Sequence, residues 1–155
     1  MNHKKLDALI MVAKTLNHHH ILWRLGASCM LYLRGYVDHF NDIDIMISLE
    51  DVKKVKSIFN AYPYQDKLPN ELYKTKVFLE YQILGVDIDM MAGFAIQNQN
   101  KIYEFPLTEH EPCDELVLDD TVIYLSKVDT WLTYYQLMNR EDKVNMIKLH
   151  GINHS

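Results

Sequence analysis

Residues 23–48 read WRLGASCMLYLRGYVDHFNDIDIMIS, and this stretch decides the fold. It places a turn of small residues at 26–28 before a short apolar run, and then sets Asp42 and Asp44 in an apolar strand pattern. Side chains alternate between the two faces of a strand, so both aspartates point to one face while the isoleucines at 43–47 point to the core. Two neighbouring carboxylates repel each other. A divalent cation such as Mg²⁺, which takes oxygen ligands, would keep both ionised.

A second stretch, GVDIDM at residues 85–90, repeats this pattern. Asp87 and Asp89 again lie two residues apart in an apolar strand, so they share a face. Periodicity does not choose between them as a partner for the first pair. Burying four aspartates without a cation or a basic partner would cost several kcal/mol each. The plain alternative is that some of them face solvent on an exposed sheet surface.

The turn, the Asp-Ile-Asp strand and the later acidic strand together resemble the nucleotidyltransferase superfamily of the DNA polymerase beta type. The match covers about residues 22–91, and the small antibiotic- and toxin-type members are the most similar in size and in the motif NDIDIMI. The resemblance implies an α+β fold, in which helices flank a mixed β-sheet and a short helical tail follows. It also implies a metal-dependent transferase.

The resemblance further implies roles for the acidic residues. Asp42 and Asp44 would hold Mg²⁺ or Mn²⁺, and a third carboxylate on the neighbouring strand would complete the site. In the family this carboxylate commonly lies near the start of its strand, after a hydrophobic residue. We therefore expect Asp87 to be the catalytic third carboxylate and keep Asp89 as the near alternative and a further metal ligand.

The turn Gly26-Ala27-Ser28 lies between a predicted strand and a predicted helix. In that geometry backbone N–H groups and a hydroxyl can face a phosphate. A simple helix start is the alternative. The family usually has Gly or Ser where Ala27 stands, a departure that removes at most one hydroxyl. Family members often carry a basic residue before the acidic strand, so Arg34 is a candidate phosphate contact, with surface exposure as the other reading.

Composition limits the class of protein. The chain has 155 residues, 48% hydrophobic and 24% charged, which is ordinary for one soluble domain spanning 1–155. The catalytic motifs fall at about 20–92 and a helical tail at about 126–151. A formal net charge of −5 disfavours strong binding of duplex nucleic acid. Two cysteines give no disulfide framework, and the sequence has no membrane span or signal peptide, so we expect a cytoplasmic protein.

Hydrophobic periodicity and turn signals predict the remaining elements. Helices are expected at 5–17, 29–33, 52–61, 126–138 and 140–150, strands at 21–25, 43–48, 75–84, 86–91 and 101–105, a hairpin at 116–125, and a loop at 62–73. Ser48 and Asp51 have the spacing of a helix-capping pair. The composition of the C-terminal helices indicates no particular function, and we expect their aromatic residues to pack in the core or at an interface.

We expect the protein to transfer a nucleoside monophosphate from a nucleoside triphosphate to a hydroxyl, with release of pyrophosphate. The nucleotide could be ATP, GTP, CTP or UTP, and the acceptor a sugar-like antibiotic, a lincosamide-like drug, a tRNA end or a protein side chain. The acceptor binds across an open face of the protein, or a second subunit of a homo-oligomer completes its pocket. One alternative is a catalytically silent regulatory or toxin–antitoxin-type binding module. Another is a metal-binding protein that uses His18, His19 and His20.

Overall fold

The structure is a computed structural model that describes residues 2–69 and 74–151. Its helices are α1 (Asn2–His18), α2 (Ala27–Leu33), α3 (Val52–Ile58, after the 3-10 turn η1, Leu49–Asp51), α4 (Val128–Leu137) and α5 (Glu141–His150). Its strands are β1 (Trp23–Gly26), β2 (Ile43–Ile47), β3 (Tyr64–Asp66), β4 (Val77–Ile83), β5 (Val86–Ala92), β6 (Phe94–Asn98), β7 (Lys101–Phe105), β8 (Cys113–Leu118) and β9 (Thr121–Ser126). None of the helices in these ranges is long and apolar enough to cross a bilayer.

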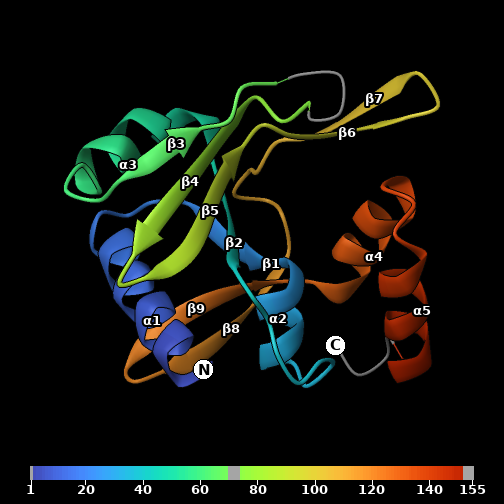
Figure 1. Cartoon of the computed structure of the whole chain (residues 1–155), viewed down its shortest axis with the longest axis horizontal. Coiled ribbons are helices and arrows are strands. Elements are labelled where there is room, and N and C mark those ends of the chain that lie inside the picture. The colour runs from blue at the N-terminus through green and yellow to red at the C-terminus, as the bar shows by residue number, and fades with distance from the viewer. Residues whose placement is uncertain (1, 70–73, 152–155) are drawn as a thin grey trace.

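A mixed β-sheet runs through the molecule (Figure 1). Within the described residues it has seven strands in the order β3-β4-β5-β2-β1-β9-β8, and β6 and β7 form a separate hairpin. Strand β2 runs parallel to β5 and antiparallel to β1, which itself runs parallel to β9. The α+β class with a mixed sheet and flanking helices is therefore confirmed.

One face of this sheet is the main core. Ile43, Ile45 and Ile47 of β2 are fully buried, as the alternation of the sequence predicts, and Ile88 and Met90 of β5 lie beside the first two of them. Helix α1 packs against β5 and β9 with its own apolar stripe. The stripe consists of Ala8, Leu9, Val12, Ala13 and Leu16. Each fully buried Leu or Ile contributes about 1.5–3 kcal/mol relative to an exposed one.

The C-terminal helices lie beyond the other side of the sheet (Figure 1). Helix α4 packs against β6 and α5. Aromatic rings fill this contact, with the Tyr134 ring centroid 4.9 Å from that of Phe94 and 4.8 Å from that of Phe105. Strand β6 and helix α4 thereby form walls next to the sheet face that carries Asp44.

The helix expected at 52–61 ends at Ile58 and the hairpin expected from residue 116 begins at Cys113, and three further predictions need correction. Residues 64–66, expected in a loop, form edge strand β3, whereas residues 70–73 of that loop lie outside the described residues. Strand β6 was not predicted, because its polar end resembles a turn. The Ser48 hydroxyl donates to the Asp51 carboxylate at 2.9 Å and does not cap a backbone N–H, so the expected capping pair does not form.

Candidate functional site

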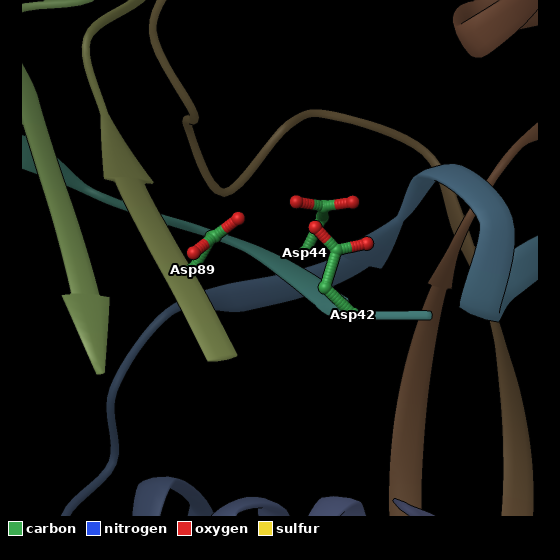
Figure 2. A group of neighbouring side chains, drawn as sticks. All are labelled: Asp42, Asp44 and Asp89. Carbon is green, nitrogen blue, oxygen red and sulfur yellow. The ribbon is translucent and has the colours of Figure 1, made fainter. Parts of the chain in front are cut away.

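The pairing of β2 with β5 brings three carboxylates together. Asp44 is the register partner of Asp89, and Asp42 lies just before β2. One oxygen from each of the three side chains can be chosen so that all lie within 4.8 Å of one another. Figure 2 shows the three carboxyl groups directed to the same side of the two strands. Among residues 2–69 and 74–151 this is the one group of three or more potential ligands that could hold a metal ion.

The structure groups Asp89, not Asp87, with the first two aspartates. Both residues point to the same sheet face, as expected, but the register separates them. Asp89 lies beside Asp44 on β2 and beside Glu80 on β4, whereas Asp87 is exposed and pairs with Gln82. The expectation of Asp87 as third carboxylate is therefore not carried further. The choice of Asp87 rested on its position near the start of the strand. Which residue lies beside Asp44 is instead set by the parallel register of β2 and β5.

Burial and neighbouring charges raise the pKa values of two of the three carboxyl groups. Burial, followed by the charges of Asp42 and Glu80, raises the pKa of Asp89 to about 7. Burial, followed by the charges of Asp42 and Asp89, raises the pKa of Asp44, and the positive charge of Lys143 opposes this rise. Without a cation, the cluster therefore holds protons near neutral pH. Such a site gains from any cation that replaces them.

The small-residue turn lies directly beside the cluster. Gly26 at the end of β1 is the register partner of Asp44. Ala27, the next residue, has φ of 54°, a left-handed conformation that L-residues seldom adopt. Ser28 follows in the first turn of α2. The strained turn thus carries its backbone and a hydroxyl to the edge of the carboxylate site, and strain of this kind is often found at functional sites.

A cavity of about 560 Å³ adjoins the turn and the cluster. Ser28, Asp42 and Asp44 lie at its polar part. Phe94, Trp131 and other apolar residues of β4–β6 and α4 form another part of its wall. This size and combination of polar and apolar surface suit a small organic ligand with a charged end.

Two basic residues reach this cavity from the C-terminal end. Arg140 precedes α5 and Lys143 lies in its first turn, and both line the cavity. The Lys143 ammonium donates to the Ser28 hydroxyl at 3.2 Å, and Arg140 is paired with exposed Asp142. Sequence reasoning missed both residues, because a lysine on a bland helix carries no sign that it packs against a turn more than a hundred residues earlier.

Arg34, by contrast, is engaged away from the cavity. Its guanidinium donates to the Asp114 carboxylate and to the Ser126 carbonyl, each at 2.8 Å. Its side chain is 9% exposed. These contacts tie α2 to β8 and β9, so the expected phosphate contact of Arg34 is not carried into the proposed site.

A second cavity of about 440 Å³ also adjoins the cluster. Asp42 lines both cavities, whereas Asp89, Glu80 and Asp87 line this second one. The three consecutive histidines, His18 to His20, end α1 and the turn that follows it. They contribute to no group of potential metal ligands in the part of the chain that the structure describes.

Comparison with known proteins identifies the fold of this chain through similar solved structures. No protein-family model matches the sequence, and no curated protein matches it. Among solved structures, one similar chain is a Thermotoga maritima protein assigned as a nucleotidyltransferase. Its TM-score is 0.75 at 18% identity, over 93% of this chain and 90% of that one.

Two further structures are of the antibiotic-resistance factor ANT(2″)-Ia. The one in complex with adenylyl-2″-tobramycin has a TM-score of 0.55 at 11% identity, over 94% of this chain and 87% of that one. The solution structure has a TM-score of 0.53 at 12% identity, over 86% and 74%. The chain therefore has the nucleotidyltransferase fold.

Proposed function

We propose that this protein is a metal-dependent nucleotidyltransferase. It moves a nucleoside monophosphate from a nucleoside triphosphate to a hydroxyl of an acceptor and releases pyrophosphate. The observation that carries the proposal is the meeting of Asp42, Asp44 and Asp89 beside the Gly26–Ser28 turn, where Asp42 and Asp44 line a cavity that Lys143 also reaches.

The donor set fits hard divalent cations. Mg²⁺ and Mn²⁺ prefer oxygen ligands, and these side chains offer carboxylate oxygens alone. Burial, and after it the charges of neighbouring carboxylates, raises the pKa values of Asp44 and Asp89, and a bound cation offsets both effects. When bound, such ions offset negative charge on the transferring phosphoryl group and on the attacking and leaving oxygens.

Different residues of the chain bind the phosphates and accept the proton. Backbone groups of the turn and the Ser28 hydroxyl face the β and γ phosphates, and Lys143 and Arg140 supply positive charge on the same side. The acceptor oxygen bonds to the α phosphorus as the bond to the bridging oxygen of pyrophosphate breaks. Asp89, which faces the second cavity, accepts the proton of the acceptor hydroxyl.

The second cavity is the acceptor side of this proposal. Asp42 lines both cavities and Asp89 lines the second one, so an acceptor held there lies next to the carboxylates that would hold the metal. Glu80 and Asp87 add two more carboxylates to its wall, which favours an acceptor that carries positive charge. The ANT(2″)-Ia structure holds an adenylylated tobramycin, so an amine-bearing sugar is the first acceptor class to test.

A direct test is pyrophosphate release. Purified protein is incubated with Mg²⁺, each of the four nucleoside triphosphates, and panels of amine-bearing and neutral polyols. Release that needs metal and acceptor, and that is lost in Asp44→Asn, supports the proposal. A catalytically silent module would instead show a metal- and nucleotide-dependent rise in melting temperature without release, and that result with every acceptor class would overturn transferase activity.

A further inference from the structure

The indole ring of Trp131 lies against Gly26. A Cβ placed on Gly26 would lie 2.6 Å from the Trp131 Nε1 atom, closer than real Cβ atoms come to any neighbour. The backbone of Gly26 is extended, with φ of −125°, so the glycine is needed for room and not for backbone freedom. Trp131 therefore fills the space that a side chain at residue 26 would need.

The N–H of this indole is buried without a partner. Trp131 is 4% exposed, and its Nε1 atom has no hydrogen-bond acceptor among the residues that the structure describes. Buried donors are nearly always paired, and each exception calls for an explanation. The other tryptophan follows the rule, since Trp23 Nε1 donates to the Asn17 side chain at 2.8 Å.

The surroundings of Trp131 indicate which acceptor it would take. Trp131 lines the same cavity as Ser28 and Lys143. The Lys143 ammonium donates a hydrogen bond to the Ser28 hydroxyl. A neutral N–H, a hydroxyl and an ammonium around one turn form a set of donors for an anion with several oxygens. Of the parts of a nucleoside triphosphate, the polyphosphate has this chemistry.

We propose that Trp131 is a binding residue for the triphosphate, and that its indole N–H donates to a phosphate oxygen held at the Gly26–Ser28 turn. This inference rests on the proposed function, because it assigns a further residue to the same substrate. It also gives Gly26 a second role, since any side chain there would displace the donor.

The two indole N–H groups allow a test in the intact protein by NMR. The probe is inorganic tripolyphosphate with Mg²⁺, which contains the part common to all nucleoside triphosphates. On titration, the Trp131 indole N–H resonance should move downfield along with the backbone amides of residues 26–28. The Trp23 indole resonance, already hydrogen-bonded and outside the cavity, should stay in place.

Two matched variants give the affinity. Trp131→Phe keeps an aromatic ring and removes the donor, so tripolyphosphate should bind about tenfold more weakly, the typical effect of one hydrogen bond to a charged acceptor. Trp23→Phe removes the other indole N–H and should leave the affinity unchanged. Calorimetry measures both, and the wild-type titration does not depend on either variant folding.

The outcomes separate this inference from the proposal beneath it. Binding that shifts the turn amides but leaves the Trp131 indole unmoved, with Trp131→Phe binding as tightly as wild type, overturns the role of Trp131 alone. If neither tripolyphosphate nor any nucleoside triphosphate binds wild-type protein in Mg²⁺, the proposed function falls and this inference falls with it.

Discussion

Asp44 of β2 lies directly beside Asp89 of β5, one pair in a parallel register that joins residues 45 positions apart in the sequence. This pairing defines the candidate site, because Gly26 flanks Asp44 on the other side. Glu80 in turn flanks Asp89. A row across four strands thus runs from the turn at Gly26 to a carboxylate at the edge of the second cavity.

Removing one acidic group should separate activity from stability. We expect Asp44→Asn to lower the rate of pyrophosphate release by about a hundredfold or more, since metal charge stabilisation contributes several kcal/mol. In EDTA the variant should melt at the wild-type temperature or above it, because a repelling carboxyl is gone. The matched control is Asp38→Asn, whose side chain is 97% exposed and away from the cluster. Wild-type transfer rates in Asp44→Asn would refute the assignment.

Stability without metal should depend on pH through Asp89. Its pKa rises on folding from 3.8 to about 7, so the native state binds more protons than the unfolded state between these values. The contribution of Asp89 to stability is then fully present below about pH 4 and is lost as pH rises to about 7. In EDTA, the difference in melting temperature between wild type and Asp89→Asn should therefore change across this window and level off above it.

With Mg²⁺ the dependence should reverse, because the ion competes with protons for the same oxygens. The rise in melting temperature on adding Mg²⁺ should be larger at pH 8 than at pH 6. An Mg²⁺ effect that is equal at the two pH values would argue against binding at these carboxylates.

Lys143 should matter for the triphosphate. Lys143→Ala removes the ammonium that contacts Ser28, so we expect KM for the nucleotide to rise about tenfold, with partial recovery in Lys143→Arg. Lys148 on the same helix is exposed and provides the control, and Lys148→Ala should change neither KM nor kcat. Equal KM values for the two alanine variants would remove Lys143 from the proposed site.

Gly26 should tolerate no side chain. The Cβ of Gly26→Ala would overlap the Trp131 ring, and relieving such an overlap typically costs about 1–3 kcal/mol. Urea unfolding should show this loss, and a smaller one when Trp131→Ala is already present, because the ring that causes the overlap is then absent. Additive effects in this double-mutant cycle would show that the close approach does not limit residue 26.

Local patterns in the sequence were enough to predict the sheet face of the acidic residues. The two-residue period of IDIMI and VDIDM places Asp44 and Asp89 opposite their buried neighbours, and both strands have that arrangement. The choice of Asp89 over Asp87 depends instead on strand register. That register is set by the packing of isoleucines and methionines from two distant segments, which no local pattern encodes.

The residues that form the cavity wall could not be predicted from the sequence for a related reason. Lys143 and Trp131 lie on helices whose composition suits any packed helix, and their place beside the turn comes from the way α4 docks on β6. The same tertiary packing gives Arg34 an acidic partner, Asp114, 80 positions away. Functional groups that lie close together in the sequence could be predicted, whereas groups that tertiary packing brings together from distant segments could not.

The most direct measurement is a crystal soaked with Mn²⁺ and a nucleoside triphosphate, with anomalous scattering used to locate the metal. The account predicts Mn²⁺ bound by Asp42, Asp44 and Asp89, with the triphosphate at the Gly26–Ser28 turn. Bound triphosphate without Mn²⁺ at these carboxylates, or Mn²⁺ bound at His18 to His20 instead, would contradict it.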